Sequence, residues 1–135
     1  KDSLGLNFTD QQYKKVWAGH LFKVDIGVKQ LQLTDLKTGN MDLKIREARQ
    51  AKKVTPVQQK MLKTKVKRFP HKLETGKWHT AVAKIVGDKL SVSIDGKEVG
   101  SFSSEGIAHP TKRMLRLAIH RNVVVDDLKI YSMAD

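Results

Sequence analysis

Few residues in this sequence have the types and spacing that catalysis requires. A retaining glycosidase needs two carboxylates about 5 Å apart, generally on one strand. No expected strand carries such a pair. Asp95 and Glu98 are close in sequence, but they flank a turn instead of lying on one strand. The best acid/base candidates are Glu105 and His109, close together in one expected loop. An ordinary structural loop is the alternative for this pair.

The sequence predicts neither a metal centre nor a cofactor. The absence of cysteine excludes disulfides and thiolate ligands, and the five histidines lack the i, i+4 or i, i+2 spacing of a zinc site. Asp126 and Asp127 are adjacent acids, but calcium requires roughly six to eight oxygen ligands. Glycines stand singly at turns, which excludes a nucleotide-binding loop. We therefore expect no bound metal or cofactor.

Positive charge is concentrated in one quarter of the chain. The formal charge is +12, and residues 41–72 contain eleven Lys or Arg against Asp42 and Glu47 alone. Such a segment predicts salt-dependent attraction to a polyanion, with a solvated helix and loop as the alternative. Nucleic acid is disfavoured because only Phe69 interleaves with the run, which leaves no stacking platform. The candidate basic patch consists of Lys44, Arg46, Arg49, Lys52, Lys53, Lys60, Lys63, Lys65, Lys67 and Arg68.

A second candidate binding surface is an open, polar sheet face. Strand-like alternation places Leu90, Val92 and Ile94 on one side of a strand and two serines on the other. A polar face of this kind suits a ligand rich in hydroxyl groups, and an ordinary solvated face is the alternative. The candidate ligand-binding residues are His79, Ser91, Ser93, Arg116 and His120.

These residues would be positioned by short strands of an all-β, antiparallel sandwich or jelly roll forming a single domain over residues 1–135. Asp95-Gly96 predicts a two-residue hairpin turn. Thr55-Pro56 with Gln58 predicts the start of one short helix, near residues 56–64. No apolar run is long enough to span a membrane. The expected strands cover residues 4–8, 16–26, 29–34, 41–46, 78–86, 90–94, 98–102, 114–119 and 123–131.

Several motifs resemble those of known domains. Gly76-Lys77-Trp78-His79-Thr80 and the hairpin from Val92 to Gly100 are similar to patterns of the concanavalin A-like lectin/glucanase superfamily. The stretches 106–112 and 125–130 also resemble a bacterial branch of it, the 3-keto-disaccharide hydrolase domain family, formerly a domain of unknown function. The resemblance covers roughly the last sixty residues well and the first seventy loosely. Trp78 is then expected in the core, with a sugar-stacking platform as the alternative.

The resemblance implies an exported protein, secreted or periplasmic, although the chain itself contains no signal peptide. It also implies that strands preceding Lys1 are missing, so that a second chain or an N-terminal segment would complete the sheet. Three functions follow as hypotheses. The first is a carbohydrate-associated domain that binds a glycan or anionic polysaccharide on its polar concave sheet or basic edge. The others are a glycoside hydrolase acting on 3-keto-glycosides and a non-catalytic structural or interaction module.

Overall fold

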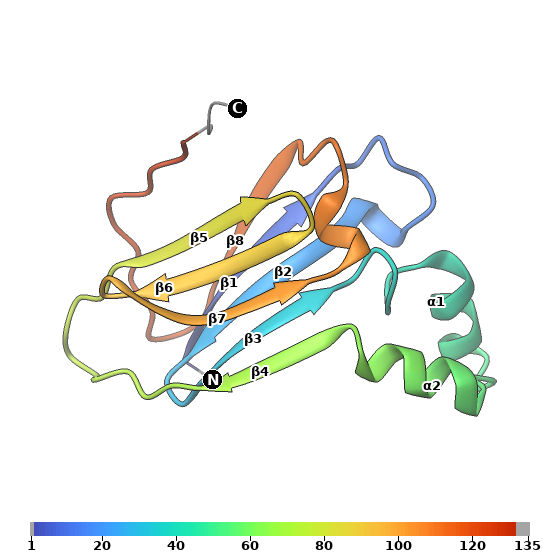
Figure 1. Ribbon diagram of the computed structural model, residues 1–135, viewed down its shortest axis with the longest axis horizontal. Coiled ribbons are helices and arrows are strands. Elements are labelled where there is room, and N and C mark those ends of the chain that lie inside the picture. The colour runs from blue at the N-terminus through green and yellow to red at the C-terminus, as the bar shows by residue number, and fades with distance from the viewer. Residues whose placement is uncertain (1, 132–135) are drawn as a thin grey trace.

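The computed structural model describes residues 2–131 and shows two antiparallel sheets that face each other (Figure 1). The expected all-β sandwich is confirmed. The large sheet has the strand order β4-β3-β2-β1-β8, formed by β1 (Ser3–Thr9), β2 (His20–Gly27), β3 (Gln30–Asp35), β4 (Val66–Pro70) and β8 (Met114–Ile119). The small sheet has the order β5-β6-β7, formed by β5 (Ala81–Val86), β6 (Lys89–Ile94) and β7 (Lys97–Ser103).

The core lies between the two sheets because apolar residues alternate along the central strands. Leu90, Val92 and Ile94 of β6 are almost completely buried, as their spacing predicts. Their counterparts on β2 and β3 include Val24 and Leu33, which are direct register partners and fully buried. Burial of these side chains supplies the main driving force for folding.

Two local signals in the sequence are confirmed. Asp95 and Gly96 both have positive φ, 53° and 82°, as a two-residue turn between β6 and β7 requires. Helix α2 (Pro56–Lys63) is capped by Thr55, whose side chain accepts a hydrogen bond from the Gln58 amide, while the Gln58 side chain accepts one from the Thr55 amide. This reciprocal cap, with proline in the first turn, fixes where the helix begins.

The strand expected over residues 41–46 is wrong, because α1 (Leu43–Gln50) occupies this region. Met41, Leu43 and Ile45 alternate as in a strand, but the Asp42 side chain accepts hydrogen bonds from the amides of Lys44 and Ile45. An aspartate in this position satisfies free amides of a first helical turn and stabilises the helix. Two short 3-10 helices, η1 (Trp17–Gly19) and η2 (Glu105–Ala108), were also not expected.

Expectations at the margins of the small sheet are also wrong. Residues 123–131 form no strand, and β5 begins at Ala81 rather than at Trp78. Trp78 lies in the preceding connection and is 70% exposed, so it is not a core residue. No helix within residues 2–131 is long and apolar enough to cross a membrane.

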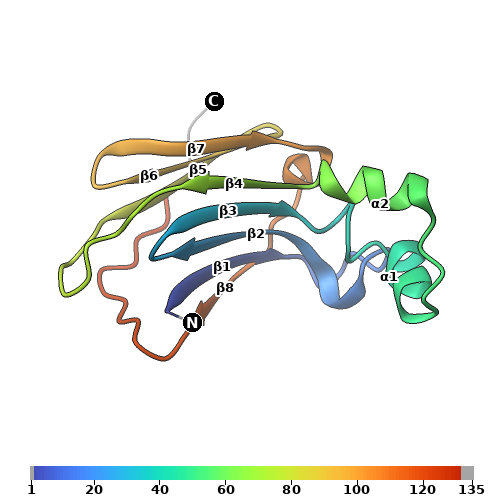
Figure 2. The ribbon, with the colours of Figure 1, turned by 90° about the horizontal axis from the view of Figure 1, so that it is seen from below.

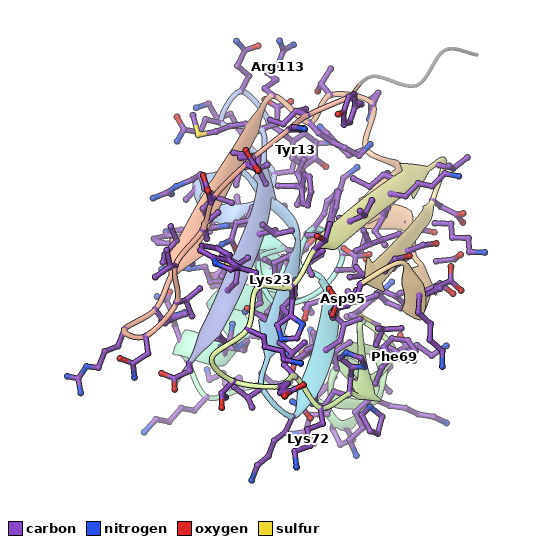
Figure 3. The ribbon with its side chains drawn as sticks, turned by 90° about the vertical axis from the view of Figure 1, so that its left-hand side faces the viewer. Tyr13, Lys23, Phe69, Lys72, Asp95 and Arg113 are labelled. Atoms are coloured by element: carbon purple, nitrogen blue, oxygen red, sulfur yellow. The ribbon has the colours of Figure 1, made fainter. Side chains whose placement is uncertain are left out.

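The sandwich is closed along the side where β4 and β7 lie and open along the other. On the closed side, Phe69 of β4, which is labelled in Figure 3, lies directly against Gly100 of β7. On the open side, β5 and β8 are the sheet edges, and Leu115 and Leu117 on the inner face of β8 are only partly buried. The two sheets therefore meet well along one margin only (Figure 2).

A fully buried carboxylate connects the sheets at one end. Asp35, the last residue of β3, accepts hydrogen bonds from the Thr38 hydroxyl (2.6 Å), the Ser104 hydroxyl and the Gly106 amide (2.9 Å). Because Ser104 and Gly106 directly follow β7 in the chain, Asp35 ties the end of the small sheet to the large one. The side chain of Asp35 is completely inaccessible to solvent, so each lost partner would leave a buried polar group unpaired.

Gly106→Ala should therefore destabilise the protein by about 3 kcal/mol, because the added methyl group would overlap the Asp35 carboxylate. Thermal or urea unfolding measures the change. Gly27→Ala is the matched control, since that position meets only the Gln30 carbonyl at 3.3 Å. Equal stability of the two variants would show that Asp35 does not organise this end of the sandwich.

Candidate functional site

Most of the candidate basic patch lies on an arm, defined as residues 36–65, that projects from one end of the sandwich. The chain leaves β3, forms α1 and α2, and returns as β4 beside β3, so both helices lie beyond the strand ends (Figure 2). Ile45 is the only buried residue of α1, and α2 has none. The arm thus presents charge to solvent. Lys44, Arg46 and Arg49 lie on α1, Lys52 and Lys53 on the connection, Lys60 and Lys63 on α2, Lys65 just before β4, and Lys67 and Arg68 on β4.

The ten cations of this patch are not neutralised by acids of the fold. Within residues 2–131, none of them forms an ion pair with a carboxylate. Arg49 donates to the Asn40 carbonyl and Arg68 to the Gln32 amide oxygen, both of which are uncharged. Of the two acids in this region, Asp42 is engaged in capping α1. The positive potential of the arm is therefore available to an external anion.

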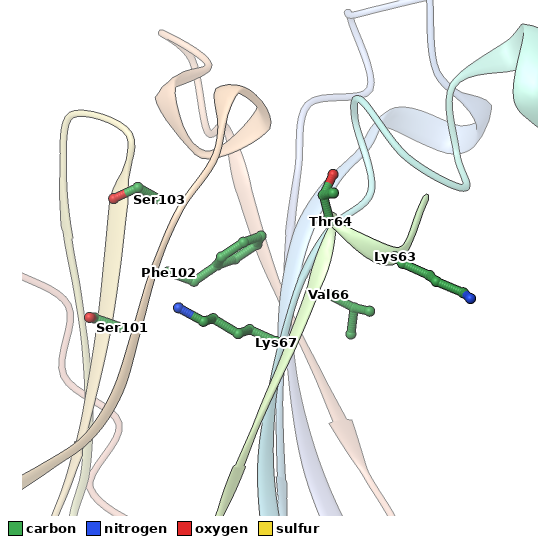
Figure 4. A pocket seen from close by; sticks show the side chains of 7 residues that line it. All are labelled: Lys63, Thr64, Val66, Lys67, Ser101, Phe102 and Ser103. Carbon is green, nitrogen blue, oxygen red and sulfur yellow. The ribbon is translucent and has the colours of Figure 1, made fainter. Parts of the chain in front are cut away.

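A hollow of 480 Å³ adjoins the arm where the edges of the two sheets meet. It lies between the end of α2, β4 and β7, and the Lys67 side chain extends from β4 toward Ser101 (Figure 4). Its volume is within the range of sites for small ligands. The seven lining residues are Lys63, Thr64, Val66, Lys67, Ser101, Phe102 and Ser103, and none of them is acidic. The Lys63 side chain points away from β7, so Lys67 is the lysine that faces the serines (Figure 4).

Stacked planar groups at the base of α1 were missed by sequence reasoning. The Arg46 guanidinium lies 4.6 Å from the centre of the Trp17 ring, and Trp17 also stacks with His20 at 5.8 Å. Burial, with the charges of Arg116 and Lys23, lowers the pKa of His20 below its ordinary value of 6.5. Trp17 and Arg46 are far apart in sequence, and the bridge between Val16 and Asp42 joins the segments that carry them.

The candidate residues of the polar face do not share one face. Ser91 and Ser93 lie on the outer side of β6 in the small sheet, whereas Arg116 lies on β8 of the large sheet and His120 follows it. The alternation that predicts each exposed position is correct for the single strand. Alternation contains no information on which sheet a strand joins. The candidate residues on β6 and β8 therefore lie on different sheets.

His79 fastens the connection between β4 and β5 to the turn between β6 and β7. Its Nδ1 lies 2.6 Å from Asp95 Oδ2, and its Nε2 lies 2.7 Å from the Glu74 carbonyl. The hydrogen bond with Asp95, followed by that with Glu74, raises the pKa of His79 above its ordinary value of 6.5. The same contact with His79 lowers the pKa of Asp95 below its ordinary value of 3.8. The pair is therefore an ion pair at mildly acidic pH, and it connects two loops of the fold.

The His79–Asp95 ion pair should make the stability of the protein depend on pH. The fold favours protonated His79, so its contribution is complete below pH 6.5 and is lost as pH rises through the raised pKa. The difference in Tm between the wild type and His79→Gln should therefore shrink from about pH 6 to about pH 9. Thermal scans measure it, and His120→Gln, at an exposed histidine, is the control. A constant difference across this range would contradict the ion pair.

The acid/base candidates Glu105 and His109 differ in environment. Glu105 is exposed at the start of η2 and makes no hydrogen bond or ion pair within the described part of the chain. His109 is buried, with Nε2 3.3 Å from Asp10 Oδ2 and its ring against Tyr13 at 4.7 Å. Asp10 is almost fully buried as well. Its hydrogen bond with Thr111, followed by those with the Gln12 amide and His109, outweighs desolvation and lowers its pKa below 3.8.

The Asp10–His109 pair is thus a buried contact that holds the loop after β1 against the segment after η2. Among residues 2–131, no group of three or more His, Asp or Glu side chains is arranged to hold a metal ion. Asp126 and Asp127 contact each other only through a backbone amide. Comparisons of this chain with protein-family models, curated proteins and solved structures find no match.

Proposed function

We propose that this β-sandwich is a binding module for an anionic polysaccharide, which lies along the α1–α2 arm and enters the hollow between β4 and β7. The observation that carries the proposal is the hollow itself, which two lysines and three hydroxyl residues line and into which Lys67 extends toward Ser101 (Figure 4). Ammonium groups attract the carboxylates or sulfates of such a polymer. The serine hydroxyls can both donate to and accept from sugar hydroxyls, whereas the Thr64 hydroxyl donates to the Met61 carbonyl and can only accept.

The arm extends the same chemistry beyond the hollow. Its lysines and arginines are exposed or half-exposed and have no acidic partners in the described chain, so a long polyanion can release counterions from many of them. Binding rather than hydrolysis is favoured because no carboxylate lines the hollow. A polysaccharide is preferred to nucleic acid because Trp17, the exposed aromatic residue nearest the arm, already stacks with Arg46 and His20.

The sequence motifs give independent support to a carbohydrate-binding domain. Their resemblance to concanavalin A-like domains and to the 3-keto-disaccharide hydrolase family covers β5, β6 and β7, the last of which forms one wall of the hollow. The same resemblance is the basis for proposing a jelly-roll topology and export from the cell. The carbohydrate specificity then resides in the lysines and hydroxyls contributed by this chain.

Titration calorimetry with a sulfated or uronic polysaccharide at low salt tests the proposal. We expect saturable binding that weakens steeply as salt rises, and a roughly five- to tenfold loss of affinity in the Lys63→Gln, Lys67→Gln double variant. Lys97→Gln is the matched control, because Lys97 is an exposed lysine at the opposite end of β7.

Three outcomes would contradict the proposal: equal binding of a neutral polymer such as dextran, equal losses in the double variant and the control, or tighter binding of single-stranded nucleic acid. The first would remove the role of charge. The second would place the ligand elsewhere on the molecule. The third would assign the arm to a different class of polyanion.

A further inference from the structure

The open side of the sandwich carries two strand edges with apolar side chains beside them. β5 pairs with β6 alone and β8 with β1 alone among the described strands. Val82 and Val86 on β5 and Ile119 on β8 are each more than half exposed. A free edge flanked by exposed apolar residues readily accepts a further strand, so it usually marks an interaction site.

The C-terminal strap, defined as residues 123–131, crosses this open side from the end of β8 toward the small sheet (Figures 1 and 2). Val124, Leu128, Ile130 and Tyr131 are between 55% and 79% exposed. The strap is rich in β-branched residues, which favour strands. The described hydrogen bonds of its own backbone amides are those of Val123 with the His120 carbonyl and of Asp127 with the Asp126 carboxylate. Among residues 2–131, this strand-forming segment has no strand partner.

The strap also contains a strained residue. Asp127 has a φ of 54°, a left-handed conformation that costs a non-glycine residue free energy. Conversion of the strap to an extended strand would remove this strain and provide partners for its free backbone groups. A partner strand would therefore gain both backbone pairing and apolar contact with the strap.

We propose that a second copy of this chain supplies that partner, by reciprocal exchange of the straps about a twofold axis. Each strap lies between the β5 edge of the other copy and the other strap. This gives one continuous sheet in which β7, β6 and β5 of one copy are followed by the two straps and then by β5, β6 and β7 of the second. The contact is self-complementary, as twofold symmetry requires.

Two features favour a second copy over simple docking of a strap onto its own β5. Docking within one chain would leave the outer edge of the strap unpaired, whereas the exchange pairs both of its edges. Charge is complementary as well, because Asp126 and Asp127 of one strap approach Lys84 and Lys89 on the β5–β6 hairpin of the other copy. The strap is one of the few acidic segments in a chain of charge +12, so this contact reduces repulsion between copies.

Analytical ultracentrifugation of the full chain from about 1 to 200 μM tests the proposal, because this range brackets a micromolar dissociation constant. We expect a species of twice the 15.3 kDa chain mass, and conversion to monomer in the Leu128→Asp, Ile130→Asp double variant. Val57→Asp is the control, because Val57 is a 78% exposed apolar residue on α2, in the arm rather than on the open side. Circular dichroism checks that each variant is folded.

Hydrogen exchange on the same samples measures the protection of the backbone amides of the strap. Amides of residues 124–130 should be protected in concentrated protein and should lose protection on dilution. A monomer over the whole range would overturn the proposal, and so would a dimer unaffected by the double variant. A monomer with a protected strap would place the strap on its own β5, which also excludes the exchange.

Discussion

The contact between the apolar face of β6 and the inner faces of β2 and β3 is the interaction on which the rest of the structure depends. Leu90 and Val92 from one sheet and Val24 and Leu33 from the other are completely removed from water. At roughly 25 cal/mol per Å² of apolar surface, this burial dominates the energetics of so small a domain. Each remaining feature, from the hairpin turns to the arm, is attached to strands that this contact holds in place.

Polar contacts then fix how the two layers are joined. Asp35 ties the end of β7 to the end of β3, and Asp10 with His109 holds the loop after β1. At the opposite end of the small sheet, His79 and Asp95 hold the connection between β4 and β5 against the turn between β6 and β7, near the surface. Buried carboxylates are costly unless they are fully hydrogen-bonded, so such contacts specify one relative placement of the sheets rather than adding much stability.

The sequence predicts the features whose causes are local. Alternation along β6, positive φ at Asp95-Gly96 and the cap of α2 at Thr55 depend on neighbouring residues, and the structure confirms all three. The strand expected over residues 41–46 is wrong because one capping side chain, Asp42, outweighs a short alternation.

Other features depend on contacts between distant parts of the chain. Trp78 looks like a core residue by its type and position, yet its exposure depends on what covers the edge of β5. Ser93 and Arg116 each occupy an outward-facing strand position, but they belong to different sheets. The basic patch was visible as a run of charge, whereas its hollow requires Ser101 and Ser103, which are contributed by a strand about forty residues further along the chain.

The arm is inserted between two strands that pair as if it were absent. β3 and β4 keep a regular register from Gln30 opposite Pro70 to Thr34 opposite Val66, although thirty residues separate Asp35 from Val66. Closing a longer loop costs only about 0.6 kcal/mol for each doubling of its length. The length and charge of this excursion can therefore change over evolutionary time with little effect on the sandwich, which separates the surface charge of the arm from the demands of folding.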